Sequence, residues 1–135
     1  MNILNRKKID ILIHLAEADG DYHPIEKTFI QKVAERHGIT EAEVEEIKEA
    51  QEPIGSLGAL SYHTCIDYLT DVLLLLPVDG KILPSEVVFC QDIALRLGFR
   101  KSGVDKLIKY IEQTEKVNAE DLSHWIRKMP HLSRP

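Results

Sequence analysis

The sequence predicts an all-α protein, a single multi-helical bundle of about seven helices. Apolar residues recur at i, i+3, i+4 and i+7 in one segment after another, which is the stripe of an amphipathic helix. Helix-capping and turn residues separate these segments, and no segment alternates like a β-strand. A chain of 135 residues has the usual size of one domain and is long enough to bury a core.

The first two predicted helices meet at an Asp-Gly corner. The apolar stripe of the first helix runs to about Ala18. Gly20 breaks this helix because glycine can take the left-handed conformation that closes a helix. Pro24 suits the first turn of the next helix, where its missing N–H costs nothing. Gly38 then ends that second helix.

Similar signals bound the later helices. Thr40 and Glu43 have the spacing of a capping box, and Ser102 and Asn118 are favoured N-caps. The fourth helix has apolar residues on most of its faces, so we expect it to be the most central. The predicted helices cover residues 3–18, 24–37, 41–50, 61–76, 84–97, 103–112 and 119–129 of a single domain at 1–130, with a loose tail at 131–135.

The stretch from residue 19 to 39 recurs sixty positions later as residues 79–99, without a gap. Nine positions are identical, where unrelated sequences would share about one or two. Flanking apolar positions align at the same offset, so the repeat is a three-helix unit at about 3–52 and 61–112. One unit alone would bury its stripes poorly, so we expect both to share a core. The identical pairs are Asp19/Asp79, Gly20/Gly80, Pro24/Pro84, Glu26/Glu86, Phe29/Phe89, Gln31/Gln91, Ala34/Ala94, Arg36/Arg96 and Gly38/Gly98.

Composition narrows the class of partner and the compartment. A net charge of -5 and a pI near 5.7 argue against a nucleic-acid binder held by phosphate contacts. No apolar run approaches the ~20 residues that span a bilayer, and the first residues lack the order of a signal peptide. Cys65 and Cys90 form no CxxC pair, and each lies on an apolar stripe. We therefore expect a cytoplasmic protein without membrane insertion or a nucleic-acid partner.

The acidic residues of the first corner have a structural interpretation. Pro24 at the first helical position makes His23 the N-cap and Glu26 the third helical residue. Histidine is a poor cap, whereas Glu26 keeps the half of a capping box that accepts the cap's own N–H. Asp19 could fold over to supply the missing acceptor, so that Asp and Glu together clamp the corner. The equivalent residues of the second copy are Leu83, Glu86 and Asp79.

The alternative for the same residues is a weakly bound divalent cation, in a sensor or buffer. Asp-Gly followed by Glu at this spacing is also the second half of an EF-hand calcium loop. The match is partial, because the two earlier ligand positions of such a loop hold Leu15 and Glu17 in the first copy and Leu75 and Pro77 in the second. Only the first copy has extra carboxylates, so we treat Asp79 and Glu86 as structural. The hypothetical metal ligands are Asp19, Asp21, Glu26 and Glu17.

The third predicted helix is acidic, whereas its counterpart in the second copy is basic, with Lys101, Lys106 and Lys109. A charge run is usually a solvated face, but this asymmetry could also dock a protein partner or a second copy of the chain. No nucleophile, phosphate-loop or zinc-site motif is present, so we expect no enzymatic activity and no required cofactor. The candidate partner-binding residues are Glu41, Glu45, Glu46 and Glu49.

The first corner and its helices resemble the TerB-like family, the tellurite resistance protein B group. The resemblance rests on Ala18-Asp19-Gly20, Pro24-x-Glu26 and Phe29-x-x-x-Val33-Ala34-x-x-x-Gly38-Ile39, and it covers roughly Ile3 to Ile111. It implies a helical bundle with a non-catalytic role in bacterial stress response, tellurite resistance or metal handling. It also places the family's acidic signature on Asp19 and Glu26, with an echo at Asp79 and Glu86.

Overall fold

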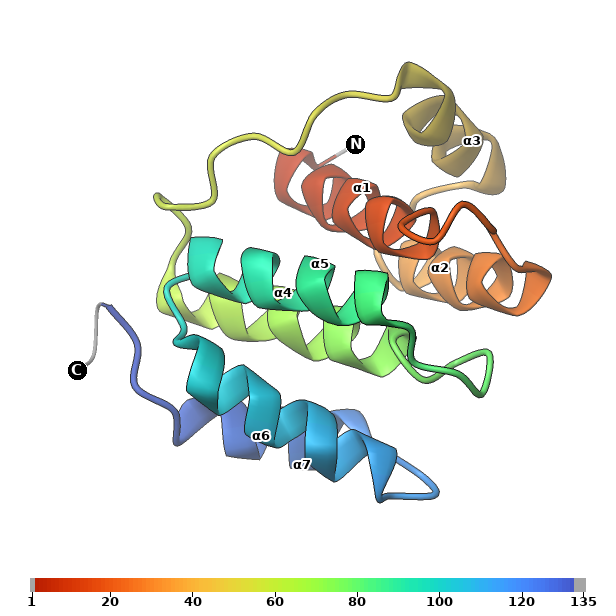
Figure 1. Ribbon diagram of the computed structural model, residues 1–135. Helices are drawn as coiled ribbons and strands as arrows, with labels where there is room; N and C mark the ends of the chain where they lie inside the picture. The colour runs from red at the N-terminus through yellow and green to blue at the C-terminus, as the bar shows by residue number, and fades with distance from the viewer. Residues whose placement is uncertain (1, 133–135) are drawn as a thin grey trace.

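The computed structural model describes residues 2–132 and is built from α-helices joined by short loops (Figure 1). Within these residues the only strand-like pairing is an isolated bridge between Phe99 and His131. None of the helices is long and apolar enough to cross a membrane. The predicted all-α class is therefore confirmed. The helices are α1 (Ile3–Ala16), α2 (Pro24–Arg36), α3 (Glu41–Ala50), α4 (Tyr62–Leu75), α5 (Pro84–Arg96), α6 (Lys101–Glu112) and α7 (Ala119–Arg127).

Most helix ends follow the predicted signals. Gly38 after α2 has a φ of 71°, and Thr40 forms the expected capping box with Glu43 at the start of α3. The predicted start of α6 after Ser102 is wrong, because Arg100 is the N-cap and Ser102 lies inside the helix. Phe99 is buried at the end of the preceding turn, and α6 begins two residues later. Its N-cap, Arg100, makes no side-chain capping bond.

Helices α1 and α4 form the centre of the bundle. Helix α1 packs against α2, α3, α4 and α5, and α4 packs against α1, α2, α5 and α7. In Figure 1, the α1–α2, α4–α5 and α6–α7 pairs follow one another across the molecule, with α3 beyond α1. One hydrophobic core runs through both halves of the chain. The prediction that α4 is central is confirmed, and α1 shares that position.

The two halves differ in the placement of their third helix. The paired helices match in length, with 14 residues in α1 and α4 and 13 residues in α2 and α5. Helix α3 packs on α1 and α2, whereas α6 packs on α5, and α7 lies along α4. The correspondence is thus close for helix, corner and helix, and looser for the third helix. An internal duplication remains a prediction.

The segment after α7 is docked on the bundle. His131 is buried, with Nε2 2.6 Å from the carbonyl oxygen of Leu97, and the N–H of Leu132 donates to the carbonyl oxygen of Gly98 at 3.1 Å. A Cβ at Gly98 would lie 2.6 Å from His131 Nε2, so glycine leaves the room that the ring needs. His131 is thus packed against the bundle, and the loose tail at residues 131–135 stays a prediction. Residues 133–135 of that prediction lie outside the described residues.

A buried ion pair joins the two central helices. Lys8 of α1 is 1% exposed, and its Nζ lies 2.6 Å from Asp67 Oδ2 and 2.7 Å from Asp71 Oδ2 of α4. Arg36 adds a contact of 3.3 Å to the other oxygen of Asp71. His37 Nε2 lies 3.1 Å from Lys8 Nζ, and burial together with the Lys8 charge lowers the His37 pKa. A neutral His37 ring therefore accepts a hydrogen bond from the ammonium.

Candidate functional site

The first corner is held by three short-range hydrogen bonds. Gly20 takes the left-handed conformation, with φ of 83°. Asp19 Oδ1 accepts the N–H of Asp21 at 2.9 Å, and Glu26 Oε1 accepts the N–H of His23 at 3.2 Å. His23 Nδ1 in turn accepts the N–H of Ile25 at 3.1 Å. Both acidic side chains thus accept hydrogen bonds from backbone N–H groups of the turn, and the His23 N–H is shared with the carbonyl oxygen of Asp21 at 3.1 Å.

The second corner repeats two of these bonds. Asp79 Oδ1 accepts the N–H of Lys81 at 3.0 Å, and Glu86 Oε1 accepts the N–H of Leu83 at 2.9 Å. Gly80 has φ of 85°. Leu83 makes no side-chain capping bond. The second corner therefore keeps the Asp, Gly and Glu interactions and lacks only the cap that His23 provides.

Two details of the predicted clamp need correction. The aspartates do not reach the following helix, because each accepts an N–H two residues ahead inside its own loop. Such a bond closes a local turn and leaves the helix N-terminus to other groups. His23 is also a working cap, since its neutral Nδ1 is an acceptor and lies within reach of the Ile25 N–H.

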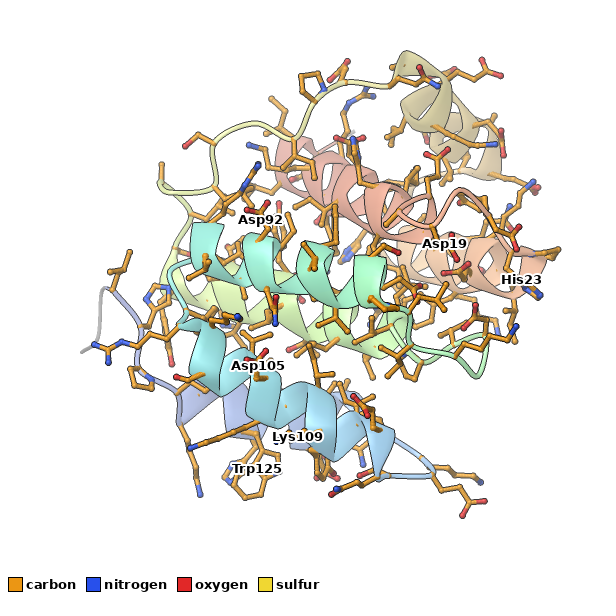
Figure 2. The ribbon with its side chains drawn as sticks, in the orientation of Figure 1. Asp19, His23, Asp92, Asp105, Lys109 and Trp125 are labelled. Carbon is orange, nitrogen blue, oxygen red and sulfur yellow. The ribbon has the colours of Figure 1, made fainter. Side chains whose placement is uncertain are left out.

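The two corners lie close together at one end of the molecule (Figures 1 and 2). Glu26 is 2% exposed and Glu86 is 1% exposed. Burial raises the Glu26 pKa to about 7, the hydrogen bond from the His23 N–H opposes this, and the negative charges of Asp79, Glu86 and Asp19 raise it further. Burial likewise raises the Glu86 pKa, aided by Asp79 and Asp19. The repeat thus assembles one cluster of four carboxylates from two corners, which we call the corner cluster.

The structure divides the predicted metal ligands into two sets. Asp19 and Glu26 belong to the corner cluster, whereas Asp21 and Glu17 are exposed on the outer side of the first loop. Across residues 2–132, no three His, Cys, Asp or Glu side chains are grouped so that they could hold one metal ion.

Two of the predicted partner-binding glutamates are engaged with α2. Glu41 Oε1 accepts a hydrogen bond from Gln31 Nε2 at 3.2 Å, and Glu45 Oε1 lies 3.4 Å from Lys27 Nζ. Glu46 and Glu49 are exposed. The acidic face of α3 is therefore partly used to hold α3 against α2.

A groove between α6 and α7 is a feature that sequence reasoning missed. The sequence places Trp125 on the apolar stripe of the last helix, but the side chain is 47% exposed. In Figure 2 its ring lies at the outer edge of the α6–α7 pair, on the side away from α5. Leu122 and Ile126 alone bury α7 against the bundle. This α6–α7 groove has a volume of about 520 Å³ and is lined by Arg100, Ser102, Gly103, Lys106, Leu107, Tyr110, Trp125, Lys128, Met129 and Pro130.

The rim of the α6–α7 groove is basic. Lys128 Nζ lies 5.2 Å from the centre of the Trp125 ring, within the range of a cation–π contact. Arg100 and Lys106 are exposed, and among residues 2–132 neither they nor Lys128 forms an ion pair. No acidic residue of the described chain lines the groove. The basic residues Lys101, Lys106 and Lys109 indicated in the sequence that this side of the protein is positively charged. Helical spacing alone could not predict the partial exposure of Trp125.

A second cavity extends the α6–α7 groove past the end of α7. It has a volume of about 320 Å³ and shares Arg100 and Pro130 with the groove. Leu95 on α5 and Leu132 after α7 border it, with exposed fractions of 53% and 85%. The two cavities together form one apolar track with basic side chains along it.

The fold and corners define an all-helical protein whose first half is organised by an Asp-Gly turn with a buried glutamate. Residues 5–49, which span α1, α2 and nearly all of α3, match the family model of the tellurite resistance protein TerB. Residues 5–49 are thus similar to TerB, in agreement with the resemblance seen in the sequence, and the match covers the first corner. No curated protein and no solved structure matches the chain significantly.

Proposed function

We propose that the protein is a non-enzymatic, TerB-like binding module that contacts a protein partner through the α6–α7 groove. The observation that carries this proposal is a half-exposed Trp125 set in an apolar groove of about 520 Å³. Exposed aromatic side chains in a groove are the residues that most often anchor a partner. The buried glutamates and the partly buried aspartates of the corner cluster act in this proposal as the structural support of the bundle.

The family name suggests the setting. TerB is described as a tellurite resistance protein, and we place this chain in a stress-response system of that type. Two buried free thiols, Cys65 and Cys90, agree with a reducing compartment such as the cytoplasm.

Site-specific photo-crosslinking in the cells that make the protein tests the proposal. A photoreactive residue at Ser102, which lines the groove, should give discrete crosslinked products that disappear when Trp125→Ala is added. The matched control is the same residue at Gln113, which is exposed near the end of α6 and does not line the groove. Identical products from both positions, or products unaffected by Trp125→Ala, would contradict the proposal.

A second candidate function is weak, outer-sphere binding of a hydrated divalent cation at the corner cluster. The favouring observation is the Glu26 pKa of about 7, raised by burial and by three neighbouring carboxylates. A cation that keeps its water shell needs no cage of direct ligands, and magnesium in particular retains waters readily.

Calorimetry with magnesium chloride at pH 7 tests this second candidate. Because Glu26 is about half protonated at that pH, a bound cation should release protons, so the measured heat should differ between buffers of different ionisation enthalpy. The Glu26→Gln variant should lose that difference, while Glu49→Gln, an exposed control on α3, should keep it. No heat at millimolar magnesium, or an unchanged signal in Glu26→Gln, would exclude the site.

A further inference from the structure

We propose that the occupant of the α6–α7 groove is an acidic amphipathic helix from another protein. This inference rests on the proposed function and names the class of partner. Its first basis is charge. The chain carries a net charge of -5, yet Arg100, Lys106 and Lys128 around the groove have no acidic side chain within ion-pair distance in the described residues.

The groove floor supplies the second basis. Leu107, Tyr110 and Met129 give it an apolar surface, and Trp125 adds an aromatic wall. A ligand with carboxylates alone would leave this surface in contact with water. An occupant must therefore pair an apolar face with an acidic one, which is the composition of an amphipathic helix.

The dimensions agree with a helical ligand. The lining residues of α6 run from Ser102 to Tyr110, which is about 12 Å of helix at 1.5 Å per residue. The adjoining cavity beyond Pro130 lengthens the track. A ligand helix of about three turns, with anchors at i, i+4 and i+7, would lie along it.

The acidic helix α3 of a second copy is a poorer occupant. Its apolar residues, Val44 and Ile47, are buried against its own bundle. The face that α3 offers to solvent is therefore polar and cannot fill the apolar floor. Two of its glutamates are also engaged with Lys27 and Gln31 of α2. An acidic amphipathic helix from another protein could both pair with the basic rim and cover the apolar floor.

Gly103 leaves room for the Met129 side chain in the lining of the groove. A Cβ at this position would lie 2.7 Å from the Met129 Cε atom, so an added methyl group would have to displace the end of the Met129 side chain. The Gly103→Ala variant should shift Met129 and alter the floor without changing any charge. It separates the contribution of shape from that of charge.

Fluorescence anisotropy with labelled synthetic helices tests the inference. The first probe carries leucine and phenylalanine anchors at i, i+4 and i+7 with glutamate on the flanking positions. A second probe replaces the glutamates with lysine, and a third replaces the anchors with serine. We expect measurable binding of the first probe only, with a change in Trp125 emission, and weaker binding at about 500 mM salt than at about 50 mM.

Charge-reversal variants locate the binding. The double variant Lys106→Glu, Lys128→Glu should lower the affinity for the acidic probe by about tenfold or more, because the negative charges on the rim would repel the probe. Lys101→Glu with Lys109→Glu is the matched control, since both lysines are exposed on α6 and outside the groove lining. All four positions are exposed, and unchanged thermal unfolding would verify the fold of each variant.

The outcomes separate this inference from the proposed function. Preferential binding of the lysine probe at Trp125, or equal binding of both probes, overturns the acidic occupant and leaves a groove-binding module. A dimer that Lys106→Glu dissociates makes a second copy the occupant and also overturns the inference. Failure of all probes together with crosslinking that ignores Trp125 would remove the inference and the proposed function at once.

Discussion

The first corner, at residues 19–26, and the second, at residues 79–86, form nearly the same backbone bonds with different sequences. The Asp-to-backbone distances are 2.9 and 3.0 Å, and the φ angles of the two glycines are 83° and 85°. The two corners share the Asp and Glu that accept backbone N–H groups, the Gly at positive φ and the Pro that starts the helix. The comparison teaches that the corner fixes Asp, Gly, Pro and Glu and leaves the cap position open.

The first helices of the two halves, α1 and α4, can be compared in the same way. Lys8 of α1 and Tyr68 of α4 occupy equivalent positions sixty residues apart, and each is 1% exposed. Lys8 reaches across to Asp67 and Asp71 of α4, whereas the Tyr68 hydroxyl donates to the carbonyl oxygen of Leu4 on α1. One crossing contact is ionic and the other is neutral, so their loss should differ in cost.

The largest expected effect is the loss of the ionic contact. Asp71→Asn should lower the free energy of unfolding by about 3 kcal/mol, because the partly exposed Asp67 then remains as the one carboxylate partner of the buried Lys8. Tyr68→Phe, the neutral counterpart, should cost about 1 kcal/mol for one lost hydrogen bond. Urea denaturation measures both. Equal losses of unfolding free energy would show that the two crossing contacts are equivalent. The double variant Lys8→Met, Asp71→Leu should recover most of the stability, because no unpaired charge is then buried.

The next effect concerns the corner cluster and depends on pH. Between pH 4.5 and about 7, folded Glu26 is protonated while the unfolded chain has lost that proton, so stability falls as pH rises through this window. Glu26→Gln keeps a capping acceptor and removes the charge. The variant should be more stable than the wild type at pH 8 by up to about 3 kcal/mol, at about 1.4 kcal/mol per pKa unit.

Glu86→Gln sharpens this test at the second corner. Its pKa is raised in the same direction, so its stabilising effect should have the same sign. At pH 4 both variants should unfold close to the wild-type temperature, because the native glutamates are then neutral. A variant that is less stable at pH 8 than at pH 4, relative to the wild type, would contradict the raised pKa values.

A smaller and symmetric effect is expected at the corner glycines. Gly20→Ala and Gly80→Ala should each cost about 1–2 kcal/mol, because an L-residue is strained at positive φ even though no atom lies within 4 Å of the added Cβ. Gly55→Ala is the control, since it has no positive φ and its Cβ would meet only the Lys7 Nζ at 3.7 Å. Unequal costs at the two corners, by calorimetric unfolding, would show that their backbones are not equivalent.

The smallest effect distinguishes the caps. His23→Ala should cost about 0.5–1 kcal/mol at pH 8, because the Ile25 N–H loses the Nδ1 acceptor. Leu83→Ser should do the opposite and add a cap that the second corner lacks. A His23→Ala variant as stable as the wild type would argue against capping by Nδ1.

Most of the fold could be predicted from the sequence because its signals are local. The Thr40 cap, the turn at Gly38 and the stripe of α4 each depend on residues within a few positions of one another. Local sequence patterns did not predict that α6 begins before Ser102 or that His131 packs against the bundle. Phe99 and Gly98, at the end of the previous turn, decide where α6 begins and where the chain after α7 is docked.

The candidate sites were harder to predict, since they depend on how helices are placed. The repeat indicated two acidic corners, but only the packing of α1, α4 and α5 brings Glu26 near Glu86. Helical spacing put Trp125 on the buried stripe, yet Leu122 and Ile126 already cover the contact and leave Trp125 on its edge. The buried ion pair of Lys8 could not be predicted from the sequence, because its partners lie on another helix.

The Lys8 pair also bears on how the bundle avoids incorrect packing. A slip of α1 along α4 by one helical turn would move the ammonium by about 5.4 Å, beyond ion-pair reach of its present partners. Apolar side chains could repack after such a slip at modest cost, but an unpaired buried ammonium could not. The pair therefore penalises wrong registers more than it stabilises the native one, and it makes the relative position of the two central helices unique.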